Sequence, residues 1–178
     1  MGLLHKTKVY CIGHMQYKDG SAWREYVREE LTPLGITVFD PYDKPFIKDV
    51  DESKEAFELA YQQLQDGDFD AVTDRMKMIR AYDLSLVDRS DFIIGHIDSD
   101  VPTFGTIEEL VVATKCKRPI FLSFENSIQS CPLWVFGMLP HKYFYDSIED
   151  VITMIKSIDD GSQKIDSSRW RLLREEYR

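Results

Sequence analysis

The sequence has 178 residues, of which 43% are hydrophobic and 12% aromatic, so it is long and apolar enough for one domain with a hydrophobic core. Its 22 basic and 31 acidic residues give a net charge of −9, which argues against a nucleic-acid polymer as partner and favours small-molecule substrates. Its hydrophobic runs are shorter than a membrane span and its N-terminus lacks the hydrophobic region of a secretory signal, so we expect a cytoplasmic protein without membrane contacts.

Hydrophobic periodicity in the first half of the chain predicts a strand, a helix, a second strand and two further helices. The run "KTKVYCIG" (residues 6–13) is a strand that ends in glycine, and "SAWREYVREELTPLG" (residues 21–35) has apolar residues at helical spacing after a serine that can cap the helix. The second strand is "ITVFDPY" (residues 36–42), closed by a proline. Two acidic amphipathic helices separated by "DGDFDA" follow between residues 51 and 89.

The second half continues this alternation. Two hydrophobic strands, "DFIIGHI" (residues 91–97) and "RPIFLSF" (residues 118–124), flank a helix in "TIEELVVATK" (residues 106–115). A short fifth strand in "KYFYD" (residues 142–146) precedes a helix at residues 147–158. This order predicts a doubly wound α/β fold.

Strands of this hydrophobicity are typical of parallel sheets buried on both faces, so we expect a flavodoxin-like five-stranded parallel sheet with flanking helices. Residues 1–160 are expected to form one domain, and residues 161–178 a charged C-terminal helix or tail. Ligands of such sheets bind beyond the carboxyl ends of the strands. The loops after the first three strands therefore mark the expected site.

The loop after the third strand enters its helix through "TFGT", Thr103 to Thr106. A helix N-terminus offers unpaired N–H groups and a positive dipole end to an anion, and Gly105 permits close approach, although the same residues also suit an ordinary cap and turn. Glu108 and Glu109 are expected in the first turn of this helix. Adjacent helical residues point about 100° apart, so only one of the two faces the site, and periodicity does not choose between them.

Three segments in order resemble the nucleoside 2-deoxyribosyltransferase superfamily, which includes the nucleoside 5′-monophosphate N-glycosidases. They are "KVYCIGHM", "RAYDLSLVDRSDFIIGHID" and "TFGTIEELVVATKCKRPI". The likeness runs from about Lys8 to Ile120, and more loosely to Ile155. Its most specific parts are the Asp-Leu pair before the "SD" strand and the pattern G-T-x-x-E-L-x-x-A.

This resemblance implies roles for four residues. Glu109, which precedes leucine and lies four before alanine, matches the family's nucleophile, and Glu108 is then its solvent-side neighbour. Composition alone makes Asp83 a surface aspartate, whereas the resemblance makes it the residue that contacts the nucleobase and assists its protonation. Tyr10 matches a tyrosine near the nucleophile, and Gly13 matches the glycine of the following loop.

The implied reaction is cleavage or transfer at the N-glycosidic bond of a nucleoside or nucleoside 5′-monophosphate through a covalent glycosyl-glutamate. Water or a second base resolves the intermediate. One carboxylate acts on the sugar while the other serves the base, so no metal and no cofactor are expected. The cysteines agree, because they show no paired spacing for a zinc site or a disulfide framework: Cys11, Cys116 and Cys131.

One departure from the family bears on the substrate. The transferases commonly have an aspartate six residues before the nucleophile, where this sequence has Thr103, and the monophosphate glycosidases have a hydroxyl residue there. Thr103 with Gly105 and Thr106 would then seat a 5′-phosphate. Asp98 and Asp100 either supply the missing carboxylate or repel a phosphate.

Further residues near these loops have open roles. His14 and Arg80 either add positive charge near the substrate or are ordinary surface residues, and His96 is expected to be a hydrogen-bonded, partly buried histidine. The family implies a homodimer or larger homo-oligomer. Two alternatives remain open: a nucleotide-sensing module without catalysis on the same fold, and a hydrolase of a larger nucleotide such as NAD.

Overall fold

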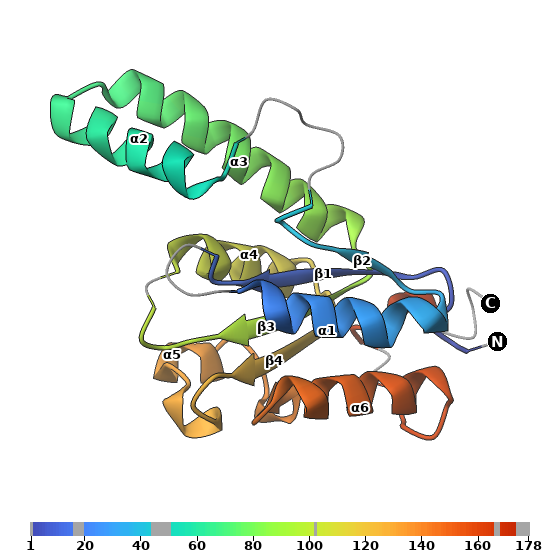
Figure 1. The fold of residues 1–178 in the computed structure, drawn as a ribbon. Coiled ribbons are helices and arrows are strands. Elements are labelled where there is room, and N and C mark those ends of the chain that lie inside the picture. Colours follow the sequence, from blue (N-terminus) through green and yellow to red (C-terminus); the bar gives the residue numbers. More distant parts are fainter. Residues whose placement is uncertain (1, 16–19, 44–50, 102, 166–167, 174–178) are drawn as a thin grey trace.

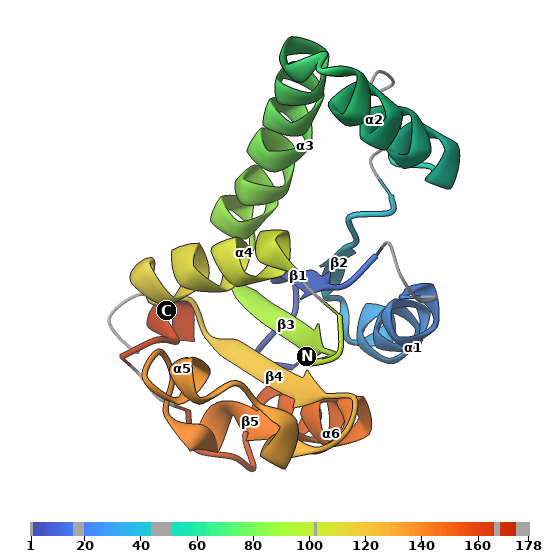
Figure 2. The same ribbon diagram turned by 90° about the vertical axis from the view of Figure 1, so that its left-hand side faces the viewer.

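The computed structural model describes residues 2–15, 20–43, 51–101, 103–165 and 168–173. Its strands form one all-parallel sheet in the order β2-β1-β3-β4-β5 (Figures 1 and 2). The strands are β1 (Lys8–Gly13), β2 (Thr37–Phe39), β3 (Phe92–Ile97), β4 (Ile120–Phe124) and β5 (Phe144–Tyr145). This arrangement confirms the doubly wound, flavodoxin-like fold.

Helices cover both faces of the sheet, as the alternation of buried side chains along each strand requires. Val9 and Cys11 of β1 belong to the core on one face, while Tyr10 and Ile12 belong to the core on the other. The first core is covered by α1 (Ser21–Leu31) and α6 (Ile148–Asp159), and the second by α3 (Phe69–Arg89), α4 (Phe104–Lys115) and α5 (Leu133–Phe136). Because both faces are buried, the central strands are almost wholly hydrophobic.

A helical hairpin projects from this body. It consists of α2 (Lys54–Asp66) and the outer part of α3, and it extends well beyond the sheet (Figures 1 and 2). Ser53 and Asp68 cap the two helices by accepting hydrogen bonds from backbone N–H groups, and Gly67 turns the chain between them with a φ of 80°. We call residues 54–80 the arm.

Most element boundaries follow the sequence, with two informative differences. Helix α1 ends at Leu31 and continues as a 3₁₀ turn, because Pro33 has no N–H for a regular helix and Gly35 adopts a left-handed conformation with a φ of 78°. Helix α4 begins at Phe104, two residues earlier than expected. Glu108 and Glu109 therefore lie in its second turn, and the expectation that they lie in the first turn is wrong.

The C-terminal segment contributes to the core. Trp170 is 2% exposed and packs against Phe92 and Phe121, with ring centroids 5.4 and 6.0 Å away. Residues Arg171–Leu173 form a 3₁₀ turn, and the rest of the predicted charged helix or tail lies partly outside the described residues. The domain limits at residue 160 stay a prediction. No described helix combines the length and hydrophobicity needed to cross a bilayer.

Candidate active site

A cavity of about 420 Å³ opens between the carboxyl edge of the sheet and the arm. Its size is in the range of small-molecule sites. Residues from the sheet, its loops and the start of α4 line one side, namely Tyr10, Gly13, His14, Met15, Pro41, Thr103, Phe104, Gly105, Thr106 and Glu109. The arm and its flanks line the other side with Glu52, Phe57, Tyr61, Met76, Ile79 and Asp83. Eight of the ten residues expected in the site are thus brought together.

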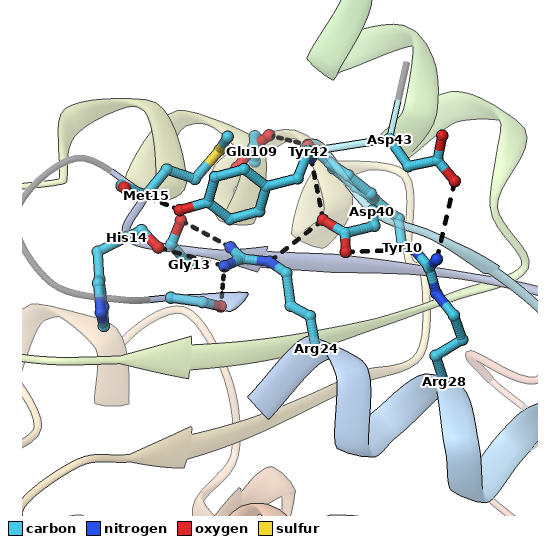
Figure 3. A network of polar contacts seen from close by, with 11 residues as sticks. Tyr10, Gly13, His14, Met15, Arg24, Arg28, Asp40, Tyr42, Asp43 and Glu109 are labelled. Atoms are coloured by element: carbon cyan, nitrogen blue, oxygen red, sulfur yellow. Dashed lines mark hydrogen bonds and ion pairs between the residues drawn. The ribbon is translucent and has the colours of Figure 1, made fainter. Parts of the chain in front are cut away.

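A short hydrogen bond in this cavity joins Tyr10 to Glu109. The Tyr10 hydroxyl donates a hydrogen bond to Glu109 Oε1 at 2.6 Å, and the two residues are 1% and 8% exposed (Figure 3). Burial, followed by the negative charges of Glu109 and Asp83, raises the pKa of Tyr10 well above its ordinary value. The phenol therefore stays protonated and acts as a donor at neutral pH.

The neighbouring glutamates differ in their surroundings. Glu109 is buried and lines the cavity, whereas Glu108 turns to Arg80 on α3 and accepts two hydrogen bonds from its guanidinium. The hydrogen bonds from Arg80 lower the pKa of Glu108. The structure thus makes the choice that helical periodicity left open, and it places Glu109 on the cavity wall.

Asp83 reaches the cavity from the other wall. It lies on α3 just before the buried residues Leu86 and Val87, which pack in the same core as Tyr10. Its charge contributes to the raised pKa of Tyr10, so the carboxyl groups of Asp83 and Glu109 act on the same small volume. Two carboxylates from separate helices therefore face one cavity.

The start of α4 forms a further part of the wall. Thr103 is the N-cap residue, yet its side chain makes no capping hydrogen bond, so its hydroxyl is available to a ligand. The first N–H groups of a helix have no acceptor within the helix. A Cβ added at Gly105 would meet no atom within 4 Å, so the backbone there borders open space. Thr103, Gly105 and Thr106 together offer donors to an anion.

Asp98 and Asp100 were expected beside the substrate, but neither belongs to the described wall of the cavity. The Asp98 side chain is buried and accepts a hydrogen bond from the Asp100 N–H at 3.0 Å, and its carbonyl accepts from the Val101 N–H at 3.2 Å. These contacts shape the loop after β3. The described wall of the cavity includes neither aspartate.

Two histidines near the loop after β1 are buried. His14 is 6% exposed, and burial, followed by the positive charges of His96 and Arg24, lowers its pKa. It lines the cavity, but its ring points away from Glu109 (Figure 3). His96 contacts Ser123 Oγ at 2.9 Å and Glu125 Oε2 at 2.8 Å, which confirms a hydrogen-bonded histidine.

Arg24 organises the backbone beside the cavity, and sequence reasoning did not identify it as a residue of the site. Its fully buried guanidinium donates to the carbonyls of Gly13 at 3.0 Å, His14 at 3.3 Å and Gly20 at 2.6 Å (Figure 3). Asp40 at the end of β2 lies 3.8 Å from its Nε. Arg24 thereby ties the loops after β1 and β2 together.

The arm contributes a hydrophobic wall that the sequence did not single out either. Phe57, Tyr61, Met76 and Ile79 line the cavity from α2 and α3. Their helical spacing was visible, but the same spacing is equally typical of a helix–helix core. Within the described residues, no cluster of three or more histidine, cysteine or acidic side chains is arranged to hold a metal ion.

The sequence matches no protein-family model and no curated protein. Its structure is similar to that of a 2-deoxyribosyltransferase from the psychrotolerant bacterium Bacillus psychrosaccharolyticus, with a TM-score of 0.55 and 18% identity over 82% of this chain and 90% of that chain. It is also similar to a CMP N-glycosidase from Clostridium botulinum, with a TM-score of 0.47 and 13% identity over 84% and 98% of the two chains. The first likeness confirms, at the level of the fold, the resemblance seen in the sequence: the chain has the fold of a 2-deoxyribosyltransferase.

Proposed function

We propose that this protein cleaves or transfers at the N-glycosidic bond of a nucleoside or nucleoside 5′-monophosphate. Glu109 is the nucleophile, Asp83 serves the base and Tyr10 orients Glu109. The observation that carries this proposal is the hydrogen bond from Tyr10 to Glu109 inside a cavity that Asp83 also lines. The fold shared with a 2-deoxyribosyltransferase supports it.

The geometry suits a double displacement at C1′ of the sugar. Glu109, whose Oε1 accepts the hydrogen bond from Tyr10, attacks C1′ through a carboxylate oxygen while the C1′–N bond breaks and its electron pair leaves with the base. Asp83 donates a proton to the departing base or stabilises its protonated form. Water or a second base then attacks C1′ and gives its proton to Asp83, while the C1′–O bond to Glu109 breaks and Glu109 leaves as a carboxylate, completing a retaining reaction.

The remaining walls fit the other parts of a nucleotide. The flat faces of Phe57 and Tyr61, with Met76 and Ile79, suit an aromatic base, because such side chains bury and stack on planar rings. The N-terminus of α4 with Thr103 suits a 5′-phosphate. A nucleoside 5′-monophosphate is therefore the favoured substrate.

Release of free base is the direct test. Purified protein is incubated with a panel of nucleosides, their 5′-monophosphates and NAD, and free base is quantified by chromatography. We expect the unaltered protein to release base from at least one nucleoside or monophosphate, and mass spectra of its quenched reactions to show a glycosyl adduct on the Glu109 peptide. We expect Glu109→Gln to release no base. Glu149→Gln, an exposed change on α6, is the matched control.

The alternatives give different results in this experiment. Binding of a nucleotide without any base release would favour the sensing module, and cleavage restricted to NAD would favour the hydrolase of larger nucleotides. Full turnover by Glu109→Gln would contradict the assignment of the nucleophile.

The cytoplasmic location and the homo-oligomeric state belong to the same proposal. Among the described residues, three large hydrophobic side chains are almost fully exposed: Phe104 at 89%, Leu133 at 88% and Trp134 at 84%. Exposed side chains of this kind are typical of association surfaces. Light scattering after size exclusion measures the oligomeric state, and a monomer at micromolar concentration would contradict this part.

A further inference from the structure

Arg80 and Glu108 form a two-bond contact between α3 and α4. The Nε of Arg80 donates to Glu108 Oε2 at 2.7 Å, and its Nη2 donates to Glu108 Oε1. This planar, fork-like geometry fixes the relative orientation of the two side chains better than a single contact does. Both side chains are partly exposed, at 60% and 39%.

Each member of the pair is close in sequence to one carboxylate of the proposed site. Glu108 immediately precedes Glu109, and Arg80 lies one helical turn before Asp83 on α3. Below Asp83, α3 is anchored in the core through Leu86 and Val87. Arg80 is at the other end of this segment, where the arm begins. The contact therefore joins the two walls of the cavity at the base of the arm.

The two walls are otherwise held differently. Glu109 is tied to the sheet by Tyr10, whereas Asp83 and the wall residues Met76 and Ile79 depend on the orientation of α3. A small change in the tilt of α3 moves them relative to Glu109. A displacement of about 1 Å costs roughly 100-fold in rate where reacting groups must be aligned.

We infer that Arg80 and Glu108 are a positioning pair, which holds α3 and the arm at the orientation that sets Asp83 and the hydrophobic wall against Glu109. Its effect on the arm is independent of the reaction, while its effect on turnover rests on the proposed function. The pair contributes little to global stability, because solvent screens ion pairs between exposed side chains. The two roles are therefore separable by experiment.

The variants are Glu108→Gln, Arg80→Met, Arg80→Lys and the reversed pair Arg80→Glu with Glu108→Arg. The control is Lys156→Met, which breaks a comparable partly exposed ion pair between α6 and α1, with Glu30, on the other side of the sheet. Hydrogen exchange of the arm amides and thermal unfolding are measured for all variants. Values of kcat and KM are measured for base release.

Breaking the contact is expected to speed exchange of the arm amides severalfold while the unfolding temperature changes little. It is expected to lower kcat about tenfold with a smaller change in KM. Arg80→Lys keeps the positive charge but loses the two-bond geometry, so it gives an intermediate effect. The reversed pair recovers part of the arm protection and part of kcat. Lys156→Met leaves arm exchange and kcat at their original values.

Unchanged arm exchange in Glu108→Gln and Arg80→Met would overturn the inference whatever the activity. Faster arm exchange with unchanged kcat in an active protein would overturn the positioning of Asp83. Absence of base release by the unaltered protein would refute the proposed function instead, and arm exchange would still decide the role of the pair.

Discussion

The Tyr10 hydroxyl lies 2.6 Å from Glu109 Oε1 and joins the middle of β1 to the second turn of α4. Both residues belong to the interior of the molecule, so the carboxylate of Glu109 is held by a rigid part of the sheet. The dipole of helix α4 acts most strongly in the first turn, and Glu109 lies beyond that turn. The helix alone therefore does not hold this carboxylate. The strand contact therefore constrains the orientation of this carboxylate in a way that the helix does not.

Removing this contact tests its importance. Tyr10→Phe keeps the ring but deletes the donor, and hydrogen bonds to charged groups contribute about 1.5–3 kcal/mol. We expect kcat for base release to fall about 10- to 100-fold, with KM changed by less than about threefold. Tyr145→Phe is the control, because that hydroxyl donates to the Lys142 carbonyl at the far edge of the sheet. Equal turnover by Tyr10→Phe and the unaltered protein would remove Tyr10 from the mechanism.

The hydroxyl of Thr103 distinguishes two substrate classes. If it contacts a 5′-phosphate, Thr103→Val loses a hydrogen bond to a charged group, and kcat/KM for a monophosphate falls about 10- to 100-fold. The value for the corresponding nucleoside stays nearly constant, because that substrate has no phosphate. Steady-state kinetics on a matched nucleoside and monophosphate pair measure both. A parallel fall for the two substrates would place Thr103 elsewhere in recognition.

Arg24 is expected to be among the most sensitive residues for stability. Its side chain is fully buried, and Arg24→Met would leave the carbonyls of Gly13 and Gly20 without their donor and Asp40 without a buried counter-charge. Breaking a buried charge pair costs about 3–5 kcal/mol. Urea unfolding measures this loss. Arg28→Met, which removes a half-exposed partner of Asp40, should cost about 1 kcal/mol or less.

The buried thiol of Cys11 is expected to make the folded protein less stable at alkaline pH. Burial raises the pKa of its thiol from 9.0 to about 12. Above pH 9 the unfolded chain loses this proton while the folded chain keeps it, so stability is full below that value and falls as pH rises toward 12. From about pH 8 to about pH 10 the loss amounts to about 1.4 kcal/mol. Urea unfolding at both values should show a smaller loss in Cys11→Ala, and identical losses would contradict a protonated buried thiol.

The fold was predictable because parallel strands buried on both faces leave a simple signature. The hydrophobic runs around Val9, Ile94 and Leu122 are uninterrupted, and the helices between them are long enough to cross the sheet. The predicted ends of helices were less accurate, because the backbone path of the adjoining loop decides where a helix begins. The early start of α4 at Phe104 follows a loop whose path periodicity does not encode.

The candidate site was predictable only in part. Motif order indicated Asp83 and Glu109, and the structure places both on one cavity. The sequence left open whether Asp98 supplies a carboxylate to the site or repels a phosphate. In the structure the Asp98 carboxylate accepts from the Asp100 N–H, a local contact that the sequence pattern does not reveal. Arg24 was missed because a charged residue reads as solvent-facing, although it lies one turn before Val27 and two before Leu31 on the buried face of α1.

The arm and the body of the protein contribute different parts of the proposed site. The groups proposed for bond breaking lie on the sheet, on α4 and at the root of α3, while the hydrophobic wall comes from a hairpin that stands outside the body. Substitutions at Phe57 or Tyr61 therefore change the shape offered to a base without disturbing the contact between Tyr10 and Glu109. Substitutions in the hairpin can accordingly change which base is preferred while the groups that break the bond stay the same.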